Sequence, residues 1–377
     1  MKISILSLCF LLLSTTIFAE TSLMRSSDVK RSAILEVNNL ENRYNKELGV
    51  ENPLAGGFND LIPYIMPTPY QENAGSCLYM SHTGIVEWWM NKLNDLQGED
   101  RIDLSERYFM ALKTERAGQD TIGNWRTDNI YRLNAESKIA LNDDYRYTKG
   151  HYKKVDGVRV ASTEDDKAAK YGTRYNWISF KDEISKDKLL DTPKFKRNVL
   201  LVDKEENQWN VAQAPLNIVD KVKEALVTNK APVLVIYNHQ GFWHANIVFG
   251  FNDNVKNECP FVSSFKPYMD ERSVALIEKA NSTKGPKKKE KYLRKAKRFT
   301  ERGDKVQSRF EEIGGCSGKG AFYVRDSIFP NEDMPIYDYD LNKEGEEKNL
   351  NSTLILREYE WLTTTANHII QILPANE

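Results

Sequence analysis

The sequence of 377 residues holds only four cysteines and five histidines, and its formal net charge is −1 at neutral pH. This charge balance lends no support to a nucleic-acid partner. Beyond the first 19 residues no stretch approaches the 18 apolar residues that a membrane-spanning helix needs, and there is no internal repeat. Asp338, Asp340 and Asn342 are spaced as in a calcium loop, but the glycine and glutamate that such a loop needs are lacking, so we predict no metal site and no cofactor.

The one long apolar run lies at the start of the chain. Lys2 is the only charge before it, and a small residue, Ala19, ends it. This pattern predicts a secretory signal peptide over residues 1–19, because the run is too short for an anchor and has no stop-transfer pattern. We therefore expect a secreted or periplasmic protein, from which Cys9 is removed with the leader.

The scarcity of cysteine leaves an odd count in the mature chain, namely Cys77, Cys259 and Cys316. In an oxidising compartment an odd thiol must be free, reactive or paired with another chain. Cys259 and Cys316 lie in one region of the sequence and Cys77 lies far away. The simplest arrangement is a Cys259–Cys316 disulfide with Cys77 as a thiol.

Helical patterns precede strand patterns along the chain. Residues 20–66 are predicted to form an N-terminal appendage, which is interpreted as a possible short pro-segment. A helix should begin near Cys77 with Ser76 as its cap, and a second near Glu106 with Ser105 or Asp103 as its cap. A further helix is expected at 216–228, followed by strands at 231–238, 244–251 and 320–327. This order predicts an α+β fold.

The strand pattern places two chemically important side chains together. If 244–251 pairs antiparallel with 320–327, His244 and Asp326 become neighbours across the sheet. Acyl transfer by a thiol needs a thiolate, favoured by a helix N-terminus, a nearby imidazole with an orienting group, and donors for the oxyanion. Cys77 at a helix start meets the need for a thiolate. His244 is the imidazole and Asp326 is its orienting group. Gln71 and the backbone N–H of Cys77 supply the donors.

These residues resemble the papain-like (C1-type) cysteine peptidases. The motifs that carry the resemblance are Gln71-x5-Cys77 with Gly75-Ser76, Leu104-Ser105-Glu106, Pro232-Val233, His244-Ala245 with Gly250-Phe251, and Asp326-Ser327. The resemblance implies a two-lobe fold over 67–377, with a helical first lobe carrying Cys77 and an antiparallel β-barrel-like second lobe carrying His244 and Asp326. It implies a cysteine-type endopeptidase that hydrolyses peptide bonds in protein or peptide substrates.

The chain departs from the family at several positions. Asp326 stands where the family has asparagine, and from this we expect Asp326→Asn to keep most activity. Ile328 replaces a tryptophan that shields the His–Asn pair, and Ala74 replaces a structural cysteine. The long interval between His244 and Asp326 predicts an insertion at about 260–315.

Other interpretations remain open. Cys77 can be an inert buried thiol, His82 is favoured as a structural residue, and His239 is a rival base. A transglutaminase-type acyl transferase has the same order of catalytic residues, and a catalytically inactive papain-like protein would serve as a binding module. The basic segment 284–305 can be a solvated face, a partner for acidic 331–350, or a site for an anionic surface or substrate.

Overall fold

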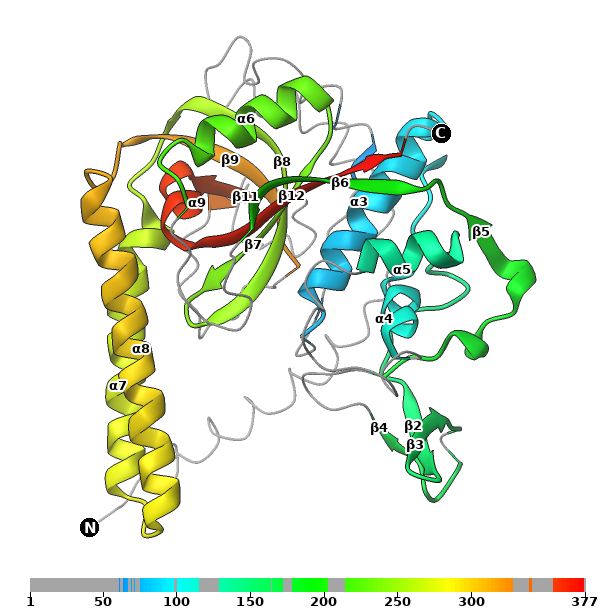
Figure 1. Ribbon diagram of the computed structural model, residues 1–377, viewed down its shortest axis with the longest axis horizontal. Coiled ribbons are helices and arrows are strands. Elements are labelled where there is room, and N and C mark those ends of the chain that lie inside the picture. Colours follow the sequence, from blue (N-terminus) through cyan, green and yellow to red (C-terminus); the bar gives the residue numbers. More distant parts are fainter. Residues whose placement is uncertain are drawn as a thin grey trace, which may run out of the picture.

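Helices and antiparallel sheet make up a mixed α+β architecture, as the sequence predicts (Figure 1). In this computed structural model the described residues are 61, 64–66, 69, 71, 75–97, 100–114, 129–163, 165–171, 178–202, 214–327, 339–340 and 355–375. The predicted signal peptide, nearly all of the 20–66 appendage, Ala74, Ile328 and most of the acidic segment 331–350 lie outside these residues.

The largest element is a seven-stranded antiparallel sheet in the order β10-β11-β9-β8-β7-β12-β6. Its strands are β6 (Phe195–Val202), β7 (Val233–His239), β8 (Phe242–Lys256), β9 (Lys319–Arg325), β10 (Tyr339–Asp340), β11 (Ile355–Glu358) and β12 (Ala366–Pro374). The predicted pairing of β8 with β9 is confirmed, with Ile247 opposite Arg325. The two lobes and the barrel-like closure stay predictions.

Strand β7 shows why this sheet is covered on both faces. All seven of its residues are buried, which accounts for the continuous apolar run in the sequence. Because successive side chains point to opposite faces, Leu234 and Ile236 join one core, and Val233, Val235 and Tyr237 join the other. Each face therefore needs its own layer of helices.

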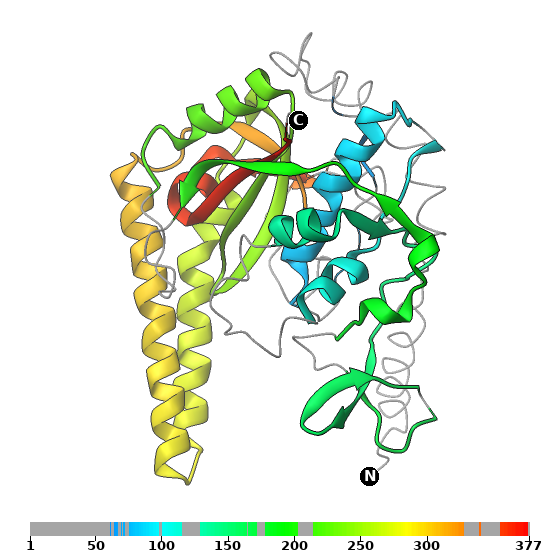
Figure 2. The same cartoon turned by 45° about the vertical axis from the view of Figure 1, so that its right-hand side comes forward.

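Helices α3 (Cys77–Leu93), α4 (Glu106–Thr114) and α5 (Asn129–Glu136) cover one face and lie together beside the sheet (Figures 1 and 2). Helix α3 is bonded to β8 by Ser81, whose Oγ donates to the carbonyl of Ala245 at 2.9 Å. The predicted cap of α4 is confirmed, since the N–H of Tyr108 donates to Oγ of Ser105 at 3.1 Å. Ser76 occupies the predicted N-cap position of α3, but its hydroxyl bonds the Tyr147 hydroxyl at 2.5 Å and makes no capping bond.

The other face is covered by α6 (Ile218–Asn229), α7 (Pro260–Asn281), α8 (Pro286–Glu312) and α9 (Tyr359–Thr365). Helices α7 and α8 form a long hairpin that projects from the sheet (Figures 1 and 2). The predicted basic helix lies in α8, whereas α7 was not predicted. Among the described residues, no helix has the length and apolar character to cross a membrane.

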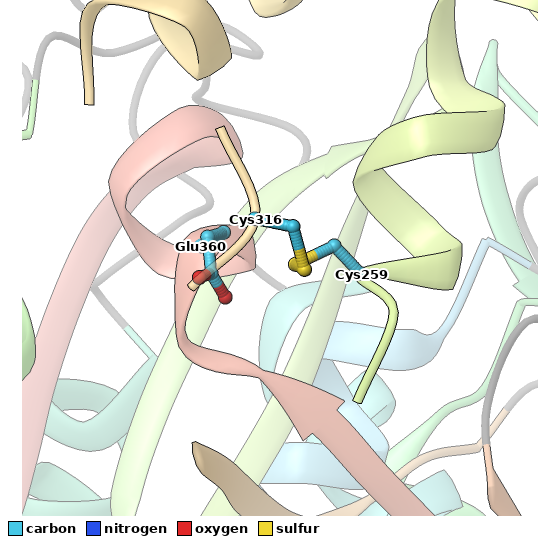
Figure 3. Close-up of side chains that lie close together, drawn as sticks. All are labelled: Cys259, Cys316 and Glu360. Atoms are coloured by element: carbon cyan, nitrogen blue, oxygen red, sulfur yellow. A yellow bond between two sulfur atoms is a disulfide. The ribbon is translucent and has the colours of Figure 1, made fainter. Parts of the chain in front are cut away.

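The predicted Cys259–Cys316 disulfide is confirmed and closes the base of this hairpin (Figure 3). Its Cα atoms are 5.7 Å apart. The carboxylate of Glu360 lies beside it, and Oε1 accepts the N–H of Ser317 at 2.8 Å. Because both sulfurs are used in the disulfide, this cluster offers no thiolate to a metal ion.

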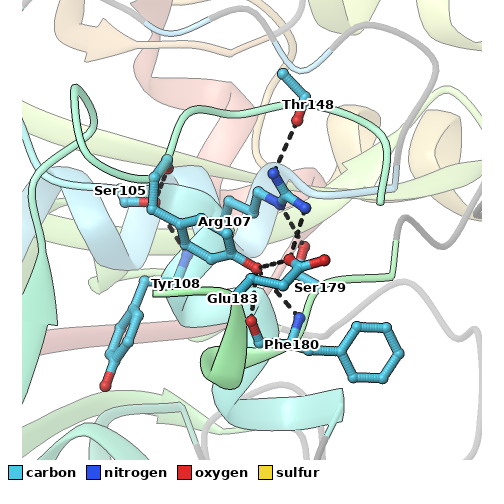
Figure 4. A network of polar contacts seen from close by, with 8 residues as sticks. Ser105, Arg107, Tyr108, Thr148, Ser179, Phe180 and Glu183 are labelled. Carbon is cyan, nitrogen blue, oxygen red and sulfur yellow. Dashed lines mark hydrogen bonds and ion pairs between the residues drawn. The ribbon is translucent and has the colours of Figure 1, made fainter. Parts of the chain in front are cut away.

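A polar network fixes the chain after residue 178 against α4 (Figure 4). Arg107 pairs with Glu183 at 2.7 Å, donates to Thr148 at 2.9 Å, and stacks over the ring of Tyr145 at 4.3 Å. The Tyr145 hydroxyl donates to the carbonyl of Phe180 at 2.7 Å. Several elements far apart in sequence are therefore held to the helical side of the molecule.

The remaining described elements are small and lie on that same side. They are β1 (Lys138–Ala140) paired with β5 (Leu189–Asp191), a sheet of β3 (Val158–Ala161), β2 (His151–Val155) and β4 (Lys170–Tyr171), and the 3-10 turns η6 (Lys181–Glu183) and η7 (Lys186–Lys188).

Candidate active site

Cys77 is the first residue of α3 and is a free thiol. The first backbone bond of the helix runs from the N–H of Met80 to the carbonyl of Ser76. The N–H of Cys77 is therefore one of the donors at the helix start that have no carbonyl partner within the helix. These donors and the helix dipole favour a negative charge at this end of α3. The side chain is buried, with 7% of the residue exposed.

His244 lies on β8 opposite Tyr237 of β7 and is 1% exposed. Its Nε2 lies 2.6 Å from Oδ1 of Asp326, so the two predicted neighbours are in direct contact. Burial by itself lowers the pKa of His244, but the Asp326 carboxylate outweighs burial. With smaller contributions from Cys77, the pKa is raised to about 9.

Nδ1 of His244 is buried and has no hydrogen-bond partner among the described residues. Cys77 is among the groups that raise the pKa of His244. Because Asp326 engages Nε2, Nδ1 is the ring nitrogen left to exchange a proton with a thiol or a substrate. One nitrogen of the His244 imidazole is therefore fixed by a carboxylate, and the other has no partner of its own in the described part of the chain.

Asp326 directly follows β9, and both of its carboxylate oxygens are used. Oδ1 bonds His244, while Oδ2 accepts Nδ2 of Asn246 at 3.0 Å and a guanidinium N–H of Arg357 at 3.1 Å. Burial alone would raise the pKa of Asp326. The neighbouring charges, first His244 and then Arg357, hold that pKa far below its usual range, so the group is ionised.

Gln71 is tied to the residue that follows Asp326. Its backbone N–H donates to the carbonyl of Ser327 at 3.1 Å, and the Ser327 hydroxyl donates to Oε1 of Gln71 at 2.7 Å. Tyr147 adds a bond from its hydroxyl to the Gln71 carbonyl at 3.1 Å, and the same hydroxyl contacts Ser76. Since the amide oxygen faces Ser327, the amide nitrogen is the donor end of the side chain.

The two rival histidines have other partners. His82 is fully buried in α3, its Nδ1 lies 2.8 Å from the carbonyl of Leu78, and burial lowers its pKa to about 4. His239 has Nδ1 2.8 Å from the Tyr237 hydroxyl, and burial, followed by Arg357 and His244, lowers its pKa well below the usual value. His82 therefore fits the structural role expected for it. Among the described histidines, His244 is the one that bonds Asp326.

Three partners of the site were missed by sequence reasoning: Asn246, Arg357 and Tyr147. Asn246 could have been found, because it lies two residues after His244 and so on the same face of β8. Arg357 and Tyr147 have no local signal, since they come from parts of the chain with no motif.

The arrangement offers a thiol at a helix start, an imidazole and an ionised carboxylate, with the N–H of Cys77 as a donor next to the sulfur. Such a set of groups can form a covalent acyl intermediate and transfer protons to and from a leaving group. In such a set the imidazole carries the protons and the carboxylate orients the ring.

No protein-family model and no curated protein matches the sequence. Among solved structures, the chain is similar to the digestive procathepsin L 3 of Tenebrio molitor larval midgut, with 11% identity and a TM-score of 0.40. The match covers 86% of this chain and 71% of that protein. A likeness of this degree carries no argument about fold or activity.

Proposed function

We propose that the chain is a papain-like cysteine peptidase that hydrolyses peptide bonds. The single observation that supports this most is His244, whose Nε2 lies 2.6 Å from Asp326 while its buried Nδ1 has no hydrogen-bond partner among the described residues. Cys77, at the start of α3, is among the groups that raise the pKa of this histidine. A buried cysteine of purely structural use has no need of an ionised carboxylate behind a histidine. We assign Cys77 as nucleophile, His244 as general acid and base, Asp326 as orienting group and Gln71 as oxyanion donor.

In the acylation step the Cys77 thiolate attacks the scissile carbonyl carbon, and the carbonyl oxygen takes the negative charge. The Gln71 amide and the N–H of Cys77 donate to that oxygen. The tetrahedral species collapses as His244 gives its Nδ1 proton to the departing amine, which leaves a thioester on Cys77. Asp326 holds the ring so that Nδ1 faces the reacting atoms.

In the deacylation step His244 is neutral and accepts a proton from water through the same nitrogen. The resulting hydroxide attacks the thioester carbonyl, the carboxylic acid product leaves, and the Cys77 thiolate and the imidazolium are restored. Because the pKa of His244 is about 9, the protonated ring required for acylation persists across the neutral range.

The wider organisation is part of the same proposal. Residues 1–19 act as a cleaved signal peptide, 20–66 as a short pro-segment or appendage, and 67–377 as the two-lobe peptidase domain with an insertion at about 260–315. The insertion corresponds to the α7–α8 hairpin and the disulfide at its base. A disulfide fits the oxidising environment of a secreted or periplasmic protein.

The test uses covalent labelling of the folded protein, with peptide cleavage measured in parallel. Iodoacetamide and the epoxide inhibitor E-64 should both modify Cys77 stoichiometrically and stop hydrolysis of a panel of fluorogenic peptides. Cys77→Ser should abolish hydrolysis, and a matched control, His151→Gln on β2, should keep most of it. Absence of hydrolysis across the panel, together with unmodified Cys77, would refute the peptidase assignment.

The low exposure of Cys77 and His244 favours one alternative, a catalytically inactive papain-like binding protein. In that case iodoacetamide labels Cys77 no faster in the folded protein than in a protein lacking His244. The transglutaminase-type alternative gives a different result, since an added primary amine then captures the acyl group in preference to water. Product analysis by mass spectrometry separates these outcomes.

A further inference from the structure

We propose that Arg357 is a positioning residue, and that Arg357 and Asp326 act on His244 as one electrically neutral unit. This inference rests on the function proposed above. It concerns a residue of β11 that carries no motif and has no role in the mechanism described above.

The carboxylate of Asp326 is shared between two tasks. Oδ1 faces Nε2 of His244 at 2.6 Å, and Oδ2 accepts from Arg357 at 3.1 Å and from Asn246 at 3.0 Å. Two donors on Oδ2 prevent the carboxylate from rotating, because rotation would give up both bonds. Arg357 thereby helps to fix the oxygen that fixes the imidazole.

Arg357 is itself held in an aromatic cage. Its guanidinium carbon lies 4.5 Å from the ring centre of Phe261, 5.5 Å from that of Tyr237 and 5.6 Å from that of Trp361. These rings come from α7, β7 and α9, and the arginine is fully buried. Ring faces attract a cation, and this attraction grows where water is excluded. The cage supports the positive charge at a fixed distance from Asp326.

A buried charge of one sign must be compensated. Asp326 without a cation would stabilise the imidazolium of His244 so strongly that the ring would become a poor acid for the departing amine. Arg357 without Asp326 would do the reverse. Among the described residues, Tyr237 and His239 from β7 also lie close to this pair, and burial keeps His239 neutral. Cys77 from α3 acts on His244 itself. The opposite charges of Asp326 and Arg357 therefore largely cancel beside the imidazole of His244.

The balance predicts opposite effects for two substitutions. Arg357→Met keeps the apolar length of the side chain but removes the cation, so the pKa of His244 should rise by about 1 unit. Asp326→Asn keeps the shape but leaves a buried cation near the ring, so the pKa of His244 should fall. In Asp326→Asn/Arg357→Met both charges are gone, and the pKa of His244 should lie above that of the single Asp326→Asn protein.

The experiment measures the pKa of His244 by NMR titration of the full mature chain with labelled histidine, together with peptide hydrolysis against pH. The alkaline limit of hydrolysis should follow the measured pKa in each protein. The double variant should hydrolyse peptide about tenfold faster than Asp326→Asn, because the pKa of His244 should be about one unit higher in the double variant. Arg309→Met is the matched control. The side chain of Arg309 is 12% exposed, but it pairs with Glu312 on α8, and its loss should leave the titration of His244 unchanged.

The outcomes separate this inference from the proposed function. If Arg357→Met shifts the pKa of His244 no more than Arg309→Met does, or if the double variant equals Asp326→Asn, the neutral-unit proposal is wrong. If the unaltered protein hydrolyses no peptide but the titrations follow the expected order, the charge balance stands and the peptidase assignment fails. If Arg357→Met does not fold, Arg357→Lys serves as the test. Because lysine keeps the charge, the proposal requires the pKa of His244 to stay near its value in the unaltered protein.

Discussion

Replacing Gly84 with alanine probes the contact that holds α3 against the end of β9. A Cβ atom at position 84 would lie 2.1 Å from Nη1 of Arg325 and 3.0 Å from Cδ1 of Ile247. Alanine in place of glycine within a helix normally stabilises by about 1 kcal/mol. The sign of the change in the free energy of unfolding therefore reports whether the guanidinium of Arg325 crosses the helix at this glycine.

The expected size follows from what Arg325 does there. Its Nη1 lies 3.7 Å from Oε2 of Glu87, and the two side chains are 4% and 2% exposed. Breaking a buried ion pair costs about 3–5 kcal/mol, and overpacking costs about 1–3 kcal/mol. Burial raises the pKa of Glu87 well above its usual value, so that this carboxyl can take up a proton instead of remaining charged without its partner. With the charge of Glu87 relieved in this way, the overpacking cost less the gain of about 1 kcal/mol in helix propensity leaves an expected loss of up to about 2 kcal/mol for Gly84→Ala.

The measurement is the free energy of unfolding from urea denaturation of the purified mature chain. Gly285→Ala is the matched control, because the nearest atom to its added Cβ is Cβ of Lys288 at 4.0 Å, and it should change stability by no more than about 0.5 kcal/mol. Arg325→Lys in the Gly84→Ala background removes the clashing nitrogen and should recover part of the loss. Because Asp326 follows Arg325, peptide hydrolysis should fall as well. A more stable Gly84→Ala protein with full activity would refute the reasoning.

Three further predictions concern the disulfide, the pH response and the oxyanion donor. Replacing both Cys259 and Cys316 with alanine should lower the free energy of unfolding by about 4 kcal/mol in the chain-entropy model for a separation of 57 residues, measured with urea; a loss under about 1 kcal/mol would contradict it. The pKa of His244 is raised in the folded state, so its stabilising effect is complete below about pH 6.5 and is lost as pH rises through about 9. Urea unfolding between these values should show a falling free energy, and His244→Gln should flatten that slope. Gln71→Ala should reduce kcat by about 10²–10³ with little change in KM, as steady-state kinetics can show; an effect on KM alone would remove Gln71 from the oxyanion site.

The parts of the fold that sequence analysis predicted well are those with a local physical signal. The apolar run at 231–238 and the pattern at 244–251 correspond to β7 and β8, and 320–327 corresponds to β9. Once β8 and β9 were assumed antiparallel, the contact between His244 and Asp326 followed from register alone. The same register accounts for the disulfide, since its cysteines lie on the chain between these two strands.

Other features depend on contacts that the local sequence does not encode. Ser76 has the residue type of a helix cap, but the Tyr147 hydroxyl, 71 positions along the chain, takes its side chain instead. Helix α7 has Pro267 in its interior, a residue that normally argues against a helix, and its packing on α8 overrides that preference. Arg357 lies in a short strand beside β9, where an isolated charged residue gives no sign of complete burial.

The bond to Arg357 changes the expected effect of having aspartate at position 326 where the papain-like family has asparagine. Judged from the motif alone, aspartate in place of asparagine adds a charge, and reversal to asparagine is expected to keep most activity. Because Arg357 is bonded to the same carboxylate, Asp326→Asn also leaves the buried Arg357 cation near the imidazole of His244 without its charged partner. Removing one partner of a buried pair is far more disruptive than replacing both. We therefore expect Asp326→Asn to lose more hydrolysis than the motif predicts, and the loss to shrink when Arg357 is replaced as well. Equal rates for the single and double variants would show that the charge of Asp326 is balanced elsewhere.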